Sequence, residues 1–152
     1  MERQSQTNGA GFITDFRTLP GYNGMNHESG SIGAKNKKSF LVYKRNKYIV
    51  VPTETIAFFY VKNETTLIVC FDKQEYFVSY SLDQIQQMVS DQQFYRLNRQ
   101  YLINFSAVKE VEHYFARKLL VNPAVPFNGR LLVSKEKARS LFRLAGKQVN
   151  EM

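Results

Sequence analysis

The chain has 152 residues, of which 43% are hydrophobic, and it contains twelve phenylalanines, nine tyrosines, no tryptophan and one cysteine. This length suffices for one ordinary domain with a tail and argues against two full domains. The formal net charge is +8, and the single cysteine excludes an intramolecular disulfide.

The positive charge is concentrated in the C-terminal part of the chain. Residues 1–90 contain ten Lys and Arg against eight Asp and Glu, whereas residues 91–152 contain eleven against five. The local net charge is therefore +2 before residue 91 and +6 after it. Such a surplus suits a polyanion, because cations that neutralise phosphates release condensed counterions. A basic domain without such a partner fits the charge equally well.

No segment resembles a membrane anchor. The sequence lacks the roughly 18 continuous apolar residues of a membrane span and the apolar core of a signal peptide. We therefore expect a cytoplasmic protein without membrane contact. Cys70 stands in the apolar run TLIVCF and is expected to be a buried thiol rather than a nucleophile.

The texture of the sequence changes near residue 38. Residues 1–38 are rich in Gly, Ser, Asn and Gln, without a sustained strand or helix period, which predicts a flexible linker or tail. Residues 39–147 are expected to form one folded domain. Residues 148–152 are expected to be a short C-terminal tail.

Five apolar runs of strand length follow the predicted tail. They are FLVYK, KYIVVP, TIAFFYV, TLIVCF and EYFVSY. Arg45-Asn46 and Asp72-Lys73 stand where hairpin turns are expected, and the aromatic and β-branched residues favour strands. This pattern predicts a β-meander of about five strands. Next, Ser81 and Gln84 have the spacing of a capping box, which predicts a short helix from Ser81.

The remaining sequence predicts more strands and a terminal helix. VKEVEHYF reads as a half-exposed strand, and Arg117-Lys118 as the basic tip of the hairpin that follows it. NPAVPFNG reads as a loop before a final strand, RLLV. Ser134 is expected to cap a helix with an apolar stripe at Ala138, Leu141, Phe142 and Ala145, and Gly146 is expected to end it.

Signatures of catalysis are absent from the sequence patterns. No Gly-rich phosphate loop follows a strand, and neither His/Cys nor Asp/Glu pairs have metal-ligand spacing. We expect neither an enzyme nor a metal or other cofactor. The segment FYRLNRQYLIN, residues 94–104, instead places amide and guanidinium donors between aromatic residues. Asn98, Arg99 and Gln100 are residue types that can bind base edges in the major groove.

This segment, followed by an alternating strand, a hairpin, NGRLLVSK and a terminal helix, resembles the LytTR (LytR/AlgR-type) DNA-binding domain of bacterial transcription and response regulators. The match covers about residues 39–146. It rests on Phe94, Arg96, Arg99, Ile103 and Asn104 in the first motif and on Asn128, Gly129, Leu131, Val133 and Ser134 in the second. Asn98 and Gln100 replace the His and Ser of the common motif, and Lys135 replaces an Arg.

The resemblance implies a mainly β, elongated fold of about ten strands in several small sheets with two short helices. It also implies that loops between strands enter successive major grooves of double-stranded DNA. The residues expected to contact DNA on this basis are Lys62, Asn63, Asn98, Arg99, Gln100, Arg117, Lys118, Lys135, Lys137 and Arg139. Of these, Arg117, Lys118, Lys137 and Arg139 are expected to bind phosphates.

The resemblance further implies the output domain of a transcription regulator, commonly of the two-component response regulator type. Family members bind paired direct repeats, so a second copy on the DNA is expected. A receiver domain would be a partner if the chain is part of a longer regulator, and a stand-alone protein is the other possibility.

Two other functions fit the residues themselves. A β-rich module could bind an acidic protein through its basic face, with Tyr95, Tyr101 and Tyr114 as exposed anchors. A single-stranded RNA binder could stack bases on interleaved aromatic and Arg side chains.

Overall fold

The computed structural model describes residues 6–8, 10–12 and 35–149, which fall into two units divided after residue 34. In the first unit, β1 (Gln6–Asn8) and β2 (Ala10–Phe12) pair antiparallel. Most of the predicted tail at residues 1–38, and residues 150–152 of the predicted C-terminal tail, lie outside the described residues. The predicted domain limits therefore stay predictions.

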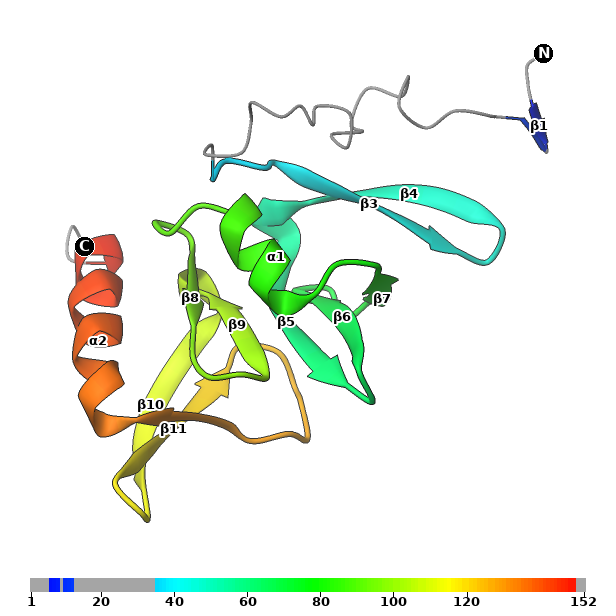
Figure 1. Cartoon of the computed structure of the whole chain (residues 1–152). Coiled ribbons are helices and arrows are strands. Elements are labelled where there is room, and N and C mark those ends of the chain that lie inside the picture. Colours follow the sequence, from blue (N-terminus) through cyan, green and yellow to red (C-terminus); the bar gives the residue numbers. More distant parts are fainter. Residues whose placement is uncertain (1–5, 9, 13–34, 150–152) are drawn as a thin grey trace. The chain divides into compact units, whose positions relative to one another are not determined.

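In the second unit, ten strands form three antiparallel sheets (Figure 1). The first pairs β3 (Ser39–Lys44) with β4 (Lys47–Pro52). The second has the order β7 (Glu75–Val78), β6 (Thr65–Cys70), β5 (Ile56–Lys62), β9 (Tyr101–Asn104) and β8 (Phe94–Arg96). The third has the order β10 (Val108–Tyr114), β11 (Lys118–Pro123) and β12 (Leu131–Ser134).

The helices are α1 (Leu82–Met88) and α2 (Lys135–Val149), with short 3₁₀ turns η3 (Thr53–Thr55) and η4 (Phe105–Ala107). The predicted mainly β fold with about ten strands, several small sheets and two helices is confirmed. None of these helices, in the ranges that the structure describes, is both long and apolar enough to cross a membrane.

The predicted meander is wrong at one junction. All five strands exist, but β4 does not pair with β5, because η3 separates them and β9 occupies the second edge of β5. The two predicted tight turns are correct: Arg45 and Asn46 have φ of 53° and 64°, and Lys73 has φ of 75°. The first five apolar runs therefore belong to two sheets.

The five-stranded sheet is apolar on both faces. Phe58 and Phe59 are both fully buried, because successive side chains of a strand point to opposite faces. On the Phe59 side, the sheet packs against β3, β4 and α1, with Phe40, Val51 and Ile85 buried there. On the Phe58 side, it packs against the third sheet and α2, with core residues that include Leu119, Val121, Val133 and Leu141. The continuous apolar run at β5 follows from this double burial.

Cys70 lies in the core on the Phe59 side, 4% exposed, as the sequence predicts. Burial, with the nearby negative charge of Asp72 as a smaller cause, raises the pKa of its thiol to about 11. The thiol is therefore protonated at neutral pH, which fits a structural side chain rather than a nucleophile.

The terminal helix α2 begins as predicted and ends later than predicted. The Ser134 hydroxyl accepts a hydrogen bond from the Lys137 backbone N–H at 3.2 Å, which is an N-cap. The helix continues past Gly146 to Val149, so the predicted stop is wrong. A glycine lowers helix stability by about 1 kcal/mol but does not by itself end a helix. Phe142, predicted in the apolar stripe, is 49% exposed.

Asn104 is a buried polar residue at the end of β9, 3% exposed. Its Nδ2 donates to the Ile56 carbonyl at 2.9 Å, and its Oδ1 accepts from the Ser106 backbone N–H at 2.9 Å, which caps η4. These bonds join β9 to the start of β5. The side chain therefore satisfies one backbone group nearby in η4 and one at the start of β5, a structural role.

We expect Asn104→Ala to lower the free energy of unfolding by about 2–3 kcal/mol, because it leaves the buried Ile56 carbonyl without its donor. Denaturant unfolding followed by circular dichroism measures this in a protein that lacks tryptophan. The control is Gln87→Ala on the exposed side of α1, which should change the value by less than about 0.5 kcal/mol. Equal effects of the two substitutions would contradict the structural role.

Candidate nucleic-acid interface

The segment between β8 and β9, residues 97–100, is the polar stretch that the sequence singles out. Leu97 anchors it: the side chain is 1% exposed, and its backbone N–H donates to the Tyr101 carbonyl at 3.0 Å. The loop therefore returns tightly onto itself before β9 begins. We call residues 97–100 the β8–β9 loop.

Asn98 holds this loop together. Its Oδ1 accepts hydrogen bonds from the backbone N–H groups of Gln100 at 2.7 Å and Tyr101 at 3.2 Å. Its Nδ2 donates to the Leu132 carbonyl of β12 at 2.6 Å. Asn98 thus closes the turn and also attaches the loop to the third sheet.

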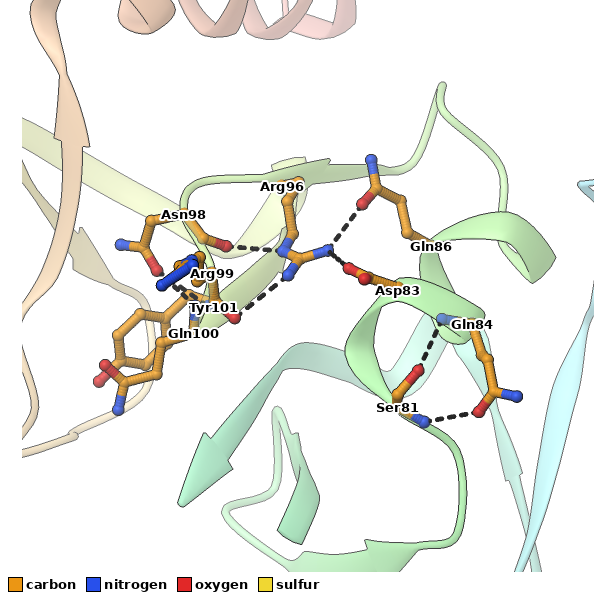
Figure 2. A network of polar contacts seen from close by, with 9 residues as sticks. All are labelled: Ser81, Asp83, Gln84, Gln86, Arg96, Asn98, Arg99, Gln100 and Tyr101. Carbon is orange, nitrogen blue, oxygen red and sulfur yellow. Dashed lines mark hydrogen bonds and ion pairs between the residues drawn. The ribbon is translucent and has the colours of Figure 1, made fainter. Parts of the chain in front are cut away.

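Arg96 attaches the same loop to α1 (Figure 2). Its guanidinium donates to the backbone carbonyls of Asn98 at 2.6 Å and Arg99 at 3.1 Å. It also donates to Asp83 Oδ1 and Gln86 Oε1, each at 2.8 Å. The Arg96 side chain is only 15% exposed. A planar guanidinium with several donors suits this arrangement, which a lysine could not reproduce.

The outward side chains of the loop are Arg99 and Gln100, and both residues are exposed. No hydrogen bond or ion pair to a described residue engages the Arg99 guanidinium. Gln100 Nε2 donates to the Val61 carbonyl at 3.2 Å, and the Val61 N–H donates to the Gln100 carbonyl at 3.1 Å. The loop is thereby fixed to β5 as well, while Arg99 projects from a backbone held on three sides.

Arg99 lines a depression of about 450 Å³ together with Lys118 and Arg130. The other lining residues are mostly from the loop and β12: Leu97, Asn98, Gln100, Leu132, Val133 and Ser134. Three cations therefore surround a partly apolar hollow that no acidic residue lines. Arg130 is not among the residues that the sequence predicts to contact DNA. Its position directly after Asn128-Gly129 was the available signal, but a single arginine before a strand is ordinary.

Gln100 also lines a second depression, of about 630 Å³, with Lys62. Lys62 ends β5 beside the two-residue turn Asn63-Glu64, where φ is 52° and 62°. Asn63 is exposed at this turn. The structure therefore brings Lys62 and the β8–β9 loop to two depressions that share Gln100, whereas Asn63 lines neither of them.

Arg117 and Lys135 lie near the C-terminal end of β12, opposite the end that Arg130 precedes. The Lys135 backbone N–H donates to the Arg117 carbonyl at 3.1 Å, and Lys118 pairs with Ser134. The Arg117 guanidinium forms an exposed ion pair with Glu136 at 3.2 Å. The Lys135 side chain is exposed and has no ion-pair partner among the described residues. Of these two residues, Lys135 is the more available cation.

Lys137 and Arg139 lie further along α2, and both are exposed. The Lys137 ammonium lies 5.9 Å from the centre of the Tyr95 ring, on the side of β8 that faces α2. Partial burial lowers the pKa of Lys137, and the positive charge of Arg96 lowers it further. Neither residue lines the depression that holds Arg99. These two predicted residues are therefore set apart from the others.

The aromatic anchors expected for a protein-binding module are not all available. Tyr101 is 4% exposed and belongs to the core, so its prediction as an exposed anchor is wrong. It stacks on Tyr60 with ring centres 6.1 Å apart, which explains its burial. Tyr95 and Tyr114 are half-buried.

The comparisons with known proteins agree with the fold. Among solved structures, the chain is similar to the LytTr DNA-binding domain of a protein from Bacillus cereus described as a methyl-accepting/DNA response regulator. The two chains are 19% identical, with a TM-score of 0.61, and the match covers 73% of this chain and 99% of that chain. No curated protein matches the sequence. Residues 46–146 match the LytTr DNA-binding domain family. The chain therefore belongs to the LytTr DNA-binding domain family.

Proposed function

We propose that this chain binds double-stranded DNA in a sequence-specific manner and acts as the output domain of a bacterial transcription regulator. The observation that carries the proposal is the β8–β9 loop. Its backbone is fixed to α1, β5 and β12, and it carries Arg99, whose guanidinium has no hydrogen-bond or ion-pair partner among the described residues and lines one depression with the exposed Lys118. Family membership supports DNA binding, and the loop geometry supports the finer statement.

Arg99 and Gln100 are the proposed readers of base edges. A guanidinium can bind O6 and N7 of guanine with two parallel hydrogen bonds. Gln100 uses one Nε2 proton on Val61, so its second Nε2 proton and its Oε1 are free to bind N7 and N6 of adenine. A rigid loop lowers the entropy cost of placing these groups in a groove.

We assign Asn98 to shaping the loop. Both lone pairs of its Oδ1 already accept backbone N–H groups, so a bidentate contact with adenine would require breaking one of them. Asn98 therefore acts on DNA through the placement of Arg99 and Gln100.

The other predicted residues divide by position. Lys62 and Asn63 at the β5–β6 turn are proposed to approach one major groove, and Lys135 the groove beyond Arg99. Lys135 lacks the planar fork of arginine, so it suits a single acceptor or a phosphate. Lys118 is proposed to hold a phosphate, as are Lys137 and Arg139 along α2. Arg117 would first have to leave Glu136.

The regulatory setting also belongs to the proposal. We infer that the domain works in the cytoplasm as part of a response regulator of the two-component type, with a receiver domain as a partner. Two copies are proposed to occupy paired direct repeats. Selection of bound duplexes from a random pool tests the binding of two copies. The selected duplexes should contain two short repeats spaced by about one helical turn or a small multiple of it.

We expect Arg99→Ala to weaken binding to the selected duplex by about 1–3 kcal/mol and to change binding to a scrambled duplex much less, because a base contact is lost. Lys118→Ala should weaken both duplexes alike, because phosphates carry no sequence information. Fluorescence polarisation measures all four affinities. A wild-type protein that binds both duplexes equally, or prefers single-stranded RNA, would contradict the proposal.

We expect Arg96→Lys to reduce the preference for the selected duplex at least several-fold although Arg96 contacts no base in this proposal, because its four bonds position the loop. Hydrogen exchange should show faster exchange of the Gln100 and Tyr101 amides. Arg143→Lys on α2 is the matched control and should change neither quantity. Unchanged exchange together with lost preference would mean that Arg96 itself contacts DNA.

A further inference from the structure

Arg130 is exposed directly before β12 and has no acidic partner among the residues that the structure describes. It shares its depression with Arg99 and Lys118, and neither of those cations is neutralised by a described side chain. Positive charges repel one another, so holding three of them around one depression costs free energy unless a negative charge compensates it. Their position therefore indicates that a negatively charged partner binds there.

The strand register fixes the spacing of these cations. Lys118 pairs with Ser134 at one end of β12, and Arg130 stands just before Leu131 at the other end. Positions 130 and 134 are four residue steps apart, and a strand rises about 3.3 Å per residue, so the backbone at Arg130 lies about 13 Å along the sheet from the Lys118–Ser134 pair. The major groove of B-DNA is about 12 Å wide. The backbone separation of the two cationic residues is thus comparable to the width of the groove, and both carry long, exposed side chains.

The β8–β9 loop is attached midway between these ends. Asn98 donates to the carbonyl of Leu132, which is two residues from Arg130 and two from Ser134. The floor around this point is apolar and rigid, since Leu97 and Val133 are each 1% exposed. Arg99 therefore belongs to a loop whose attachment point on β12 lies between the two flanking cations, and it lines the same depression as both of them.

We propose that Arg130 and Lys118 hold DNA backbone phosphates on opposite sides of the groove that Arg99 enters. This inference rests on the proposed function. It adds Arg130 as a DNA-contacting residue and assigns different roles to Arg130 and Arg99, which line the same depression. Arg130 acts without regard to sequence, as a charge on phosphate oxygens. Arg99 acts on the base edges between the two held strands.

The test measures the affinity of the full chain for the selected and scrambled duplexes across a range of salt concentrations. Each phosphate contact adds about 0.9 to the slope of log affinity against log salt concentration. Arg130→Gln and Lys118→Gln should each lower the slope by about that amount, and the double variant by about twice as much. Affinity for the two duplexes should fall by the same factor, about 3- to 10-fold at roughly 0.1 M salt.

Three further variants sharpen the result. Arg130→Lys should retain most of the slope, because an ammonium also binds phosphate, whereas Arg99→Lys should lose discrimination between the duplexes. Arg143→Gln on α2 removes the same charge away from the depression and should leave the slope nearly unchanged. The exposed position of Arg130 makes an unfolded variant unexpected, and thermal unfolding by circular dichroism checks this.

The outcomes separate the inference from the proposed function. If the wild-type chain discriminates between duplexes but Arg130→Gln has the slope of Arg143→Gln, the inference fails and the proposed function stands. If Arg130→Gln abolishes the preference for the selected duplex instead of lowering both affinities equally, Arg130 contacts bases and its assignment to a phosphate is wrong. If the wild-type chain binds no duplex, both fail together.

Discussion

The fold depends on the burial of both faces of the five-stranded sheet. A sheet with one polar face could stand with a single covering layer, but adjacent buried residues such as Phe58 and Phe59 demand a layer on each side. The chain supplies β3, β4 and α1 on one face, and the third sheet with α2 on the other. The β8–β9 loop lies where these layers meet, so elements from both of them can hold it.

This position explains why the polar network is possible. Arg96 bonds to α1, which belongs to one covering layer, and Asn98 bonds to β12, which belongs to the other. Each bond ties the loop to an element whose own place is set by core packing rather than by the loop. Because these supporting elements are packed in the core, they fix the backbone of the loop, and the exposed side chains of Arg99 and Gln100 extend from fixed positions. In the proposed function, such a preformed loop lowers the entropy lost on binding DNA.

Much of the strand content could be predicted from the sequence, because short apolar runs and turn residues such as Arg45-Asn46 are local signals. The pairing of β5 with β9 could not, because it joins segments some forty residues apart and the succession of short apolar runs favoured β4 as the neighbour of β5. For the proposed site, the residue types of Arg99 and Gln100 were the signal that the sequence offered. The role of Asn98 was hidden, since its partner Leu132 is 34 positions away. Arg130 was missed because nothing distinguishes it locally from a solvated charge, and only the depression relates it to Arg99 and Lys118.

The attachment of Asn98 to β12 also bears on self-association. β12 is an edge strand, and an edge strand with open carbonyl and N–H groups invites pairing with another chain. The Leu132 carbonyl, at the middle of this short strand, is already occupied by the Asn98 carboxamide. An incoming strand would have to displace that bond and the loop with it. The Asn98 side chain thus has two effects. It shapes the β8–β9 loop, and it hinders another strand from pairing with the edge of β12.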